Sequence, residues 1–159
     1  MGMLEVVKDI TERKKMEEEI RDSEMMYHTI IQLSGQMGEA IIILQNTEHD
    51  KDVQTFVSNE WLRITGYSQE ELLGKPFFDL ISPRDRAGSV EYHRKKMFGE
   101  PISDLYEMSV IRKNGTEIPI EVRSAYAMYK GKVANIVHLR DITERKRMQE
   151  QLIMQDRLA

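Results

Sequence analysis

Cysteine is absent from the 159 residues of this chain, and long apolar runs are absent as well. Without thiols the chain has no disulfide, no zinc–thiolate site and no cysteine nucleophile, and nothing marks a secreted protein. The longest apolar run, Ala40 to Leu44, falls far short of the roughly 18 residues that cross a bilayer. We therefore expect a soluble, cytoplasmic segment with no direct membrane contact, although its parent protein could be anchored in a membrane.

Charge of one sign is not in large excess, because 23 lysine and arginine residues are mixed with 27 aspartate and glutamate residues, for a net charge of −4. The basic residues do not gather into a patch for nucleic acid. His28, His49 and His138 lie on different expected elements and lack the spacing that brings two imidazoles to one metal. No glycine-rich phosphate loop occurs either. These absences predict a domain with no metal, no nucleic-acid partner and no enzymatic activity of its own.

One segment of the sequence is repeated. Residues 9–16, DITERKKM, return as residues 141–148, DITERKRM, and the two copies differ only at Lys15 and Arg147. The offset, 141 − 9 = 132 residues, is that of one small domain plus a linker. We therefore expect one module that carries the exit segment of a preceding module. Its parts are a linker helix at residues 1–22, a domain at 23–143 and an output helix at 144–159.

The first copy opens an expected helix from Thr11 to Leu33, because neither glycine nor proline interrupts this range. Asp9 or Thr11 is the expected cap, with Glu12 completing a capping box. Apolar or small residues recur every three or four positions, which is the a/d spacing of a two-stranded coiled coil. The alternative is a solvated amphipathic helix lying on its own domain. The expected seam of a homodimer comprises Met16, Ile20, Tyr27 and Ile30, with Met148 and Leu152 at the matching spacing in the second copy.

The rest of the chain alternates short strands with helices and then ends in strands. Asn114-Gly115 indicates a tight hairpin between two of these strands. Trp61, Leu62 and Ile64 are expected to face the core, and so are the apolar residues between Phe77 and Ile81. The order of elements predicts an α+β domain with helices on one face of an antiparallel sheet. Strands are expected at 40–44, 53–58, 105–112, 116–128 and 133–140, short helices at 59–65 and 69–73, and a longer helix at 84–98.

Five separated motifs resemble those of a PAS sensor domain with its C-terminal PAC segment, over residues 23–147. The motifs are FVSN at 56–59, TGYSQEELLGK at 65–75, ISPRDR at 81–86, RKNG at 112–115 and DIT at 141–143. The resemblance implies a five-stranded antiparallel sheet that cups a small pocket, a dimer-prone N-terminal helix, and an output helix that begins at the DIT motif. Ser82 and Arg84 depart from the usual family pattern, and we expect both on the surface.

The same resemblance implies a ligand pocket between the longer helix and the sheet. Light-sensing flavin members form an adduct with a cysteine, which this chain lacks. Haem-sensing members bind iron through a histidine where this chain has Gly88, and we expect His93 on the same helix at the surface or the rim. No cofactor is therefore expected, although an unidentified small ligand suits a methionine-rich cavity. The alternative is a core that its own side chains fill completely. The candidate pocket residues are Ile42, Leu62, Val90, Met97, Met108, Val110, Ile120 and Val137.

Asp141, Ile142 and Thr143 join the last strand to the exit helix without a flexible spacer. We expect these residues to transfer the signal, with Asp9 and Thr11 as their counterparts in the first copy. Asp141 or Thr143 can cap the exit helix, and Ile142 can pin it to the domain.

Residues 152–159 resemble the start of the dimerisation helix of sensor histidine kinases. The expected function is a sensory relay in two-component phosphorelay signalling. Its expected partners are a second copy of itself and the adjacent PAS and histidine kinase domains of the same chain. The alternatives are a cofactor-binding redox or gas sensor, and a PAS interaction module that feeds a diguanylate cyclase or a transcription regulator.

Overall fold

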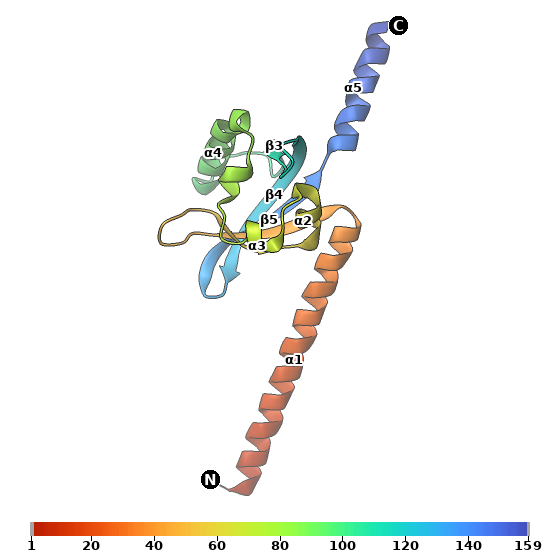
Figure 1. Ribbon diagram of the computed structural model, residues 1–159. Coiled ribbons are helices and arrows are strands. Elements are labelled where there is room, and N and C mark those ends of the chain that lie inside the picture. The colour runs from red at the N-terminus through yellow and green to blue at the C-terminus, as the bar shows by residue number, and fades with distance from the viewer. Residues whose placement is uncertain (1, 159) are drawn as a thin grey trace. The chain divides into compact units, whose positions relative to one another are not determined.

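The computed structural model describes residues 2–158 (Figure 1). Contacts divide the chain into two units, residues 1–34 and 35–159. Helix α1 (Met3–Gln36) forms the described part of the first unit and its last two residues belong to the second; none of its residues is buried. Among residues 2–158, no helix combines the length and the apolar content that a membrane crossing needs.

Helix α1 begins eight residues (11 − 3) before the predicted start at Thr11. No glycine or proline separates Met3 from Leu33, so nothing in this stretch stops the helix from extending upstream. Asp9 and Thr11 therefore lie inside the helix. The Thr11 hydroxyl donates to the carbonyl oxygen of Val7 at 2.9 Å and does not cap a helix start. The prediction that Asp9 or Thr11 caps α1 is wrong.

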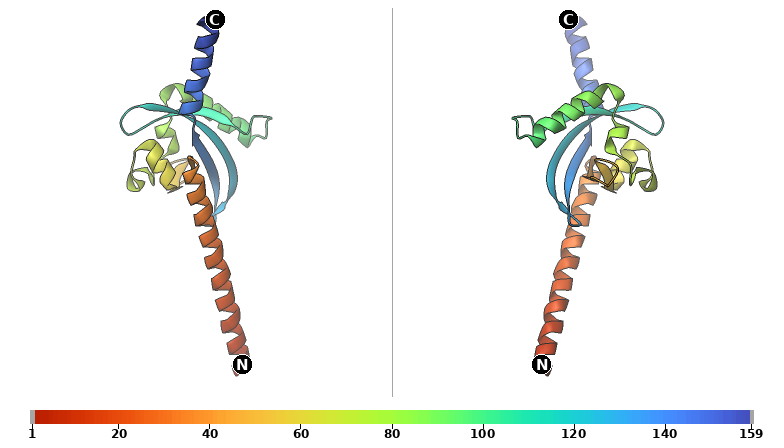
Figure 2. Two further views of the ribbon diagram at one scale, coloured as in Figure 1. Left: turned by 90° about the vertical axis from the view of Figure 1, so that its right-hand side faces the viewer. Right: turned by 90° about the vertical axis from the view of Figure 1, so that its left-hand side faces the viewer.

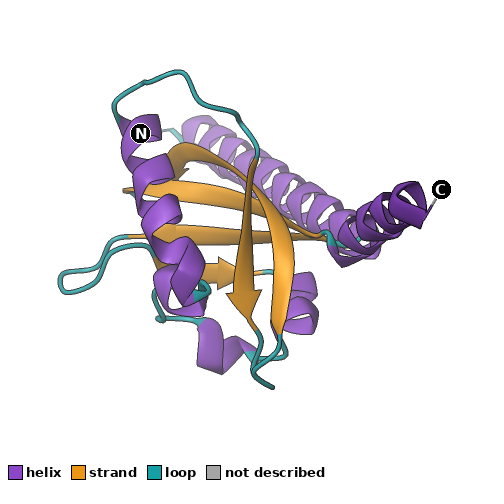
Figure 3. Cartoon of the chain, turned by 90° about the horizontal axis from the view of Figure 1, so that it is seen from above, coloured by secondary structure: helices purple, strands orange, loops and turns teal. Residues whose placement is uncertain are grey.

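The second unit is built on a five-stranded antiparallel sheet, as the sequence predicts (Figure 3). In the strand order β2-β1-β5-β4-β3, the central strand is β5, the last strand of the chain. It pairs with β1 on one side and with β4 on the other. The sheet is strongly curved, as the side views show (Figure 2). The strands are β1 (Glu39–Gln45), β2 (Val53–Val57), β3 (Tyr106–Ile111), β4 (Glu117–Tyr129) and β5 (Lys132–Asp141).

Four helical segments connect β2 to β3, and a fifth follows β5. The core forms where α2, α3 and η1 contribute apolar side chains to the inward face of the sheet, including Trp61, Leu72 and Phe77. Glycine at position 66, with φ of 77°, ends α2 in the left-handed conformation. The segments are α2 (Asn59–Thr65), α3 (Gln69–Leu72), the 3-10 helix η1 (Phe77–Leu80), α4 (Pro83–Met97) and α5 (Thr143–Leu158).

Three side chains lie differently from the prediction. Phe78 is 40% exposed, because the three-residue period of η1 turns Phe77 and Leu80 inward and leaves Phe78 outside. Leu62 is only partly buried against the core. Ser82 is buried rather than on the surface, and its hydroxyl donates to a carboxylate oxygen of Glu117 at 2.9 Å.

Candidate signalling site and cavity

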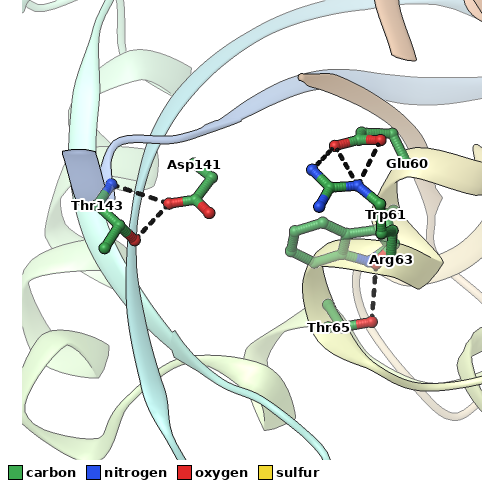
Figure 4. Close-up of polar contacts among 6 residues, drawn as sticks. All are labelled: Glu60, Trp61, Arg63, Thr65, Asp141 and Thr143. Carbon is green, nitrogen blue, oxygen red and sulfur yellow. Dashed lines mark hydrogen bonds and ion pairs between the residues drawn. The ribbon is translucent and has the colours of Figure 1, made fainter. Parts of the chain in front are cut away.

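The central strand β5 ends at Asp141, and α5 begins two residues later. The Asp141 carboxylate accepts hydrogen bonds from the backbone N–H of Thr143 at 2.9 Å and from the Thr143 hydroxyl at 2.5 Å (Figure 4). Asp141 therefore caps the helix as predicted, and Thr143 donates to it without competing for the cap. The cap is a local interaction between residues two apart.

Ile142 fixes the junction to the sheet. Its side chain is 3% exposed, and its backbone N–H donates to the carbonyl oxygen of Pro119 on β4 at 3.1 Å. Its own carbonyl accepts from the backbone N–H of Lys146 at 3.0 Å, inside the first turn of α5. The pinning role predicted for Ile142 is thus visible in its contacts. Ile142 therefore joins β4, the end of β5 and the first turn of α5.

A guanidinium group that sequence reasoning missed lies in the same region. Arg63 on α2 forms an ion pair with Glu60 (Figure 4). The pKa of Arg63 is raised, mainly by its hydrogen bond to Glu60 and to a smaller extent by the negative charge of Asp141. The position of Arg63 in an ordinary amphipathic helix gave no signal for this arrangement.

The first turn of α5 is held to the sheet by charged groups. Glu107 on β3 and Glu121 on β4 are directly opposite each other in the antiparallel ladder. Two like charges in that position repel unless a cation lies between them. Arg145 donates to Glu107 at 2.7 Å and to Glu121 at 2.9 Å, and Lys146 pairs with Glu107 at 2.7 Å. We call these four residues the α5 clamp.

The clamp perturbs the ionisation of its members. The pKa of Glu107 is lowered, chiefly by the hydrogen bond from Lys146, with further contributions from the charges of Lys146 and Arg145. The pKa of Arg145 is raised, chiefly by its hydrogen bond to Glu121. The turn motif did not predict the clamp, because a two-residue Asn114-Gly115 turn would put Val122 opposite Glu107, whereas the observed register puts Glu121 there.

A cavity of about 440 Å³ lies between α4, η1 and the sheet. We call it the α4 cavity. Three of the eight predicted pocket residues, Val90, Met108 and Val137, line it. The remaining apolar lining includes Leu44, Phe77 and Val122. The structure therefore has a partly open hollow beside its buried core.

The other five predicted residues lie elsewhere. Ile42, Val110 and Ile120 are fully buried in the core and do not reach the cavity. Leu62 packs on the core from α2. Met97 is 66% exposed, because the face of α4 toward the cavity is Ser89, Tyr92, His93 and Lys96 at the i, i+3, i+4, i+7 spacing, and Met97 is one residue past it.

Several polar groups of the α4 cavity were missed by sequence reasoning. Lys96 donates to the Ser124 hydroxyl at 2.7 Å and also to the Ser124 carbonyl oxygen. Desolvation by burial lowers the pKa of Lys96. Asn135 on β5 faces the cavity, and its Oδ1 atom is buried without a hydrogen-bond partner. These residues come from three elements, so their meeting depends on the register of β4 and β5.

Gly88 and His93 are the two residues of α4 on which the haem prediction depends. His93 lines the cavity half-buried, and its ring nitrogens lie 3.4 Å from the Tyr126 hydroxyl, which agrees with the predicted rim position. Gly88 is close to Tyr106, whose hydroxyl lies 2.7 Å from where a Cβ atom on Gly88 would stand. A side chain at position 88 would therefore require Tyr106 to move.

A curved antiparallel sheet, a ligand-sized cavity under α4 and a central strand that runs directly into an exit helix together define a sensory domain of the α+β class. The chain belongs to the PAS domain family, because the family model described as PAS domain matches residues 38–144. The sequence-based identification and the predicted fold class are both confirmed.

Two curated relatives and one solved structure are representative of the similarities. The chain is 38% identical over 82 residues to the methyl sulfide methyltransferase-associated sensor of Methanosarcina acetivorans, a match that covers 52% of this chain and 8% of that protein. It is 23% identical over 155 residues to sporulation kinase C of Bacillus subtilis, covering 94% of this chain and 35% of that kinase. The chain thus spans well under half the length of either relative.

The solved structure is the PAS domain of a two-component sensor histidine kinase. It shares 20% identity with a TM-score of 0.55, and the match covers 75% of this chain and 98% of that one. At this identity the likeness concerns the fold. The chain therefore has the fold of that PAS domain, in agreement with the family match.

Proposed function

We propose that this PAS domain is a signal-relay module of a cytoplasmic sensor histidine kinase in a two-component phosphorelay. The observation that carries the proposal is the continuity of β5, which lines the α4 cavity with Asn135 and Val137 and ends at Asp141. One strand thus connects the cavity to the start of the output helix. The similarity to sporulation kinase C supports a kinase as the parent. The domain itself carries no catalytic role in this proposal.

The free energies at the junction suit a relay. A helix cap such as that of Asp141 contributes about 1 kcal/mol, and 1.4 kcal/mol changes an equilibrium constant about tenfold. Exchanging the Asp141 cap and the α5 clamp for another arrangement would bias two states of α5 without unfolding the domain. We propose that the bias appears as a rotation or a shear of paired output helices.

Pairing of helices is proposed from their exposed apolar residues. In the described chain, Met16 and Ile20 on α1 are 62% and 58% exposed, and Met148 and Leu152 on α5 are 63% and 62% exposed. Tyr27 and Ile30 on α1 continue the same stripe. Two copies of this chain would bury these stripes in parallel or antiparallel seams. The adjacent PAS and kinase domains of the same chain are the other proposed partners.

The test is Asp141→Ala in the full-length parent protein, with autophosphorylation as the readout. Removing the cap is expected to change kinase activity by roughly two- to tenfold, since about 1 kcal/mol is at stake. Thermal melting should show a folded domain. Glu48→Ala, which removes an exposed carboxylate from the loop between β1 and β2, is the matched control and should leave activity unchanged. Unchanged kinase activity in a folded Asp141→Ala protein would contradict the relay.

A further inference from the structure

Helix α5 is held against the rest of the domain mainly by charged side chains. None of its described residues is buried, so no apolar side chain of this helix enters the core. Ile142, the residue before the helix, is buried and fixes the point at which the helix starts. The direction that α5 takes from that point therefore depends on the α5 clamp, whose ion pairs join Arg145 and Lys146 to the sheet.

Most of the clamp is open to water and to dissolved ions. The side chains of Arg145, Lys146 and Glu107 are 43%, 42% and 46% exposed, whereas that of Glu121 is 16% exposed. Exposed ion pairs weaken as salt is added, because the Debye length falls from about 10 Å at 0.1 M to about 3 Å at 1 M ionic strength. Each such pair shifts an equilibrium by at most about fivefold, so salt can remove much of what holds α5 in place.

The two carboxylates of the clamp oppose release of the helix at low salt. Glu107 and Glu121 are register partners on β3 and β4, and Arg145 donates to both, at 2.7 Å and 2.9 Å. If Arg145 left, these like charges would repel each other across the ladder. Salt screens this repulsion as well as the attraction in the docked state, so both effects of salt favour release.

A like charge on the second turn of α5 weakens the docking of the helix. Glu150 lies four residues after Lys146, on the same face of α5. It lines a groove between α5, the sheet and the start of α4. The charged residues of this groove are four carboxylates and two cations, namely Asp85, Glu107, Glu117, Glu150, Arg84 and Lys146. Glu150 therefore opposes the docking that Lys146 favours one turn earlier.

We propose that the α5 clamp is an ionic-strength switch. At low salt, Arg145 and Lys146 hold the first turn of α5 on the sheet. At high salt they separate from Glu107 and Glu121, and the helix swings about Ile142, which stays buried. The dissolved ions are then the signal, and no ligand in the α4 cavity is needed. Because the switch acts on the output helix, its role in signalling rests on the proposed function.

The test follows the distance between the sheet and α5 in the whole 159-residue chain. Because the chain has no cysteine, Lys132→Cys on β5 and Gln155→Cys on α5 supply two labelling sites, one on each side of the hinge. Time-resolved energy transfer between dyes on these sites measures the distance, with excess unlabelled chain so that each dye pair lies within one molecule. Between about 0.05 M and 1 M KCl, we expect the ratio of docked to released helix to fall roughly three- to tenfold. Sucrose at the same osmolality should leave this ratio unchanged.

Two variants and a control assign the effect to the clamp. Arg145→Met combined with Lys146→Met removes both cations and keeps their aliphatic length, so α5 should be released at the lowest salt and should not respond to KCl. Arg147→Met removes a neighbouring cation whose ion pair, with Glu144 at 3.8 Å, lies within the helix, and it should behave like the wild type. Glu150→Gln removes the opposing charge and should move release to higher KCl concentration.

Circular dichroism checks that each variant is folded, and Glu107→Gln combined with Glu121→Gln replaces the double methionine variant if that one does not fold. The inference is overturned if the wild-type distance is the same at both KCl concentrations, or if sucrose releases the helix as KCl does. It is also overturned if Arg147→Met loses the salt response, or if Glu150→Gln is released at lower KCl concentration than the wild type.

These results are distinct from those for the relay. An effect of Asp141→Ala on kinase activity, together with a distance that does not depend on salt, would remove only the switch. Salt-dependent release of α5 without any effect of Asp141→Ala would remove only the relay.

Discussion

The side chains of Gln54 and Trp61 form a hydrogen bond with each other inside the core. Both are 0% exposed, and the indole N–H of Trp61 donates to Oε1 of Gln54 at 2.9 Å. We expect Gln54→Leu to lower the free energy of unfolding by about 1–3 kcal/mol, because the indole N–H stays buried without an acceptor. Urea denaturation followed by circular dichroism measures the loss. Gln69→Leu, at an exposed position of α3, is the control and should change stability little; equal stability of the two variants would contradict the role of this hydrogen bond.

Glu107 makes the α5 clamp sensitive to pH. Its pKa is lowered in the folded protein, so its contribution to stability is present above the ordinary glutamate pKa and is lost as pH falls through the lowered folded value. Between neutral pH and a pH below about 4, where an ordinary glutamate is protonated, the wild type should therefore lose more stability than Glu107→Gln. Urea midpoints of both proteins across this range measure the difference. Parallel pH profiles would show that the ion pairs with Lys146 and Arg145 contribute nothing.

At the output junction, the residues that the sequence placed correctly are those that local patterns mark. Asp141 caps Thr143 two residues away, and Ile142 follows a strand whose alternation marks its inward side. Lys96 and Asn135 were missed because they meet only through the pairing of β4 with β5 and the packing of α4 on both. A hydrophobic pattern also favours apolar candidates, so it does not mark a buried amide on β5.

At the scale of whole elements, the periodic patterns predicted nearly every strand and helix. The capping box of Ser68 and Glu71 is present as expected. The hairpin at Asn114-Gly115 is present too, but the backbone N–H of Arg112 donates to the carbonyl oxygen of Thr116, so its loop has three residues and not the two predicted. The start of α1 was mispredicted because a cap motif inside a continuous run of helix formers does not begin a helix. The prediction for α4 was wrong at Met97. The hydrophobicity of Met97 favoured it as a cavity residue, but Lys96 lines the cavity with its aliphatic stem and its bound ammonium group.

The stripe on α1 can be tested in the same chain. Met16→Glu combined with Ile20→Glu puts like charges at two successive seam positions, and we expect it to weaken self-association at least tenfold. Sedimentation equilibrium of the 159-residue chain measures this. Lys14→Glu combined with Glu18→Lys exchanges charges four residues apart without touching the stripe and should associate like the wild type. Association of the glutamate variant at wild-type strength would mean that α1 is a solvated helix.

At the scale of the whole molecule, the two copies of the DITERK segment have different surroundings. The second copy lies at a strand end, where Asp141 caps α5 and Arg145 and Lys146 hold it to the sheet. The first copy lies inside α1, where the equivalents of these residues, Asp9, Arg13 and Lys14, are exposed. The first copy therefore lacks the contacts that the second copy makes, and the tandem array that the sequence repeat predicts stays a prediction.

If the proposed relay acts by a rotation of paired helices, the phase of α5 relative to the effector must matter more than its length. In the full-length protein, inserting seven residues after Leu152 returns the helix to within about 20° of its original phase, whereas inserting five turns it by about 140°. We therefore expect the seven-residue insertion to keep kinase activity and its dependence on Asp141, and the five-residue insertion to lose both. Autophosphorylation of the two insertion proteins, each with and without Asp141→Ala, measures this, and equal loss in both would show that proximity and not helix phase couples this domain to its effector.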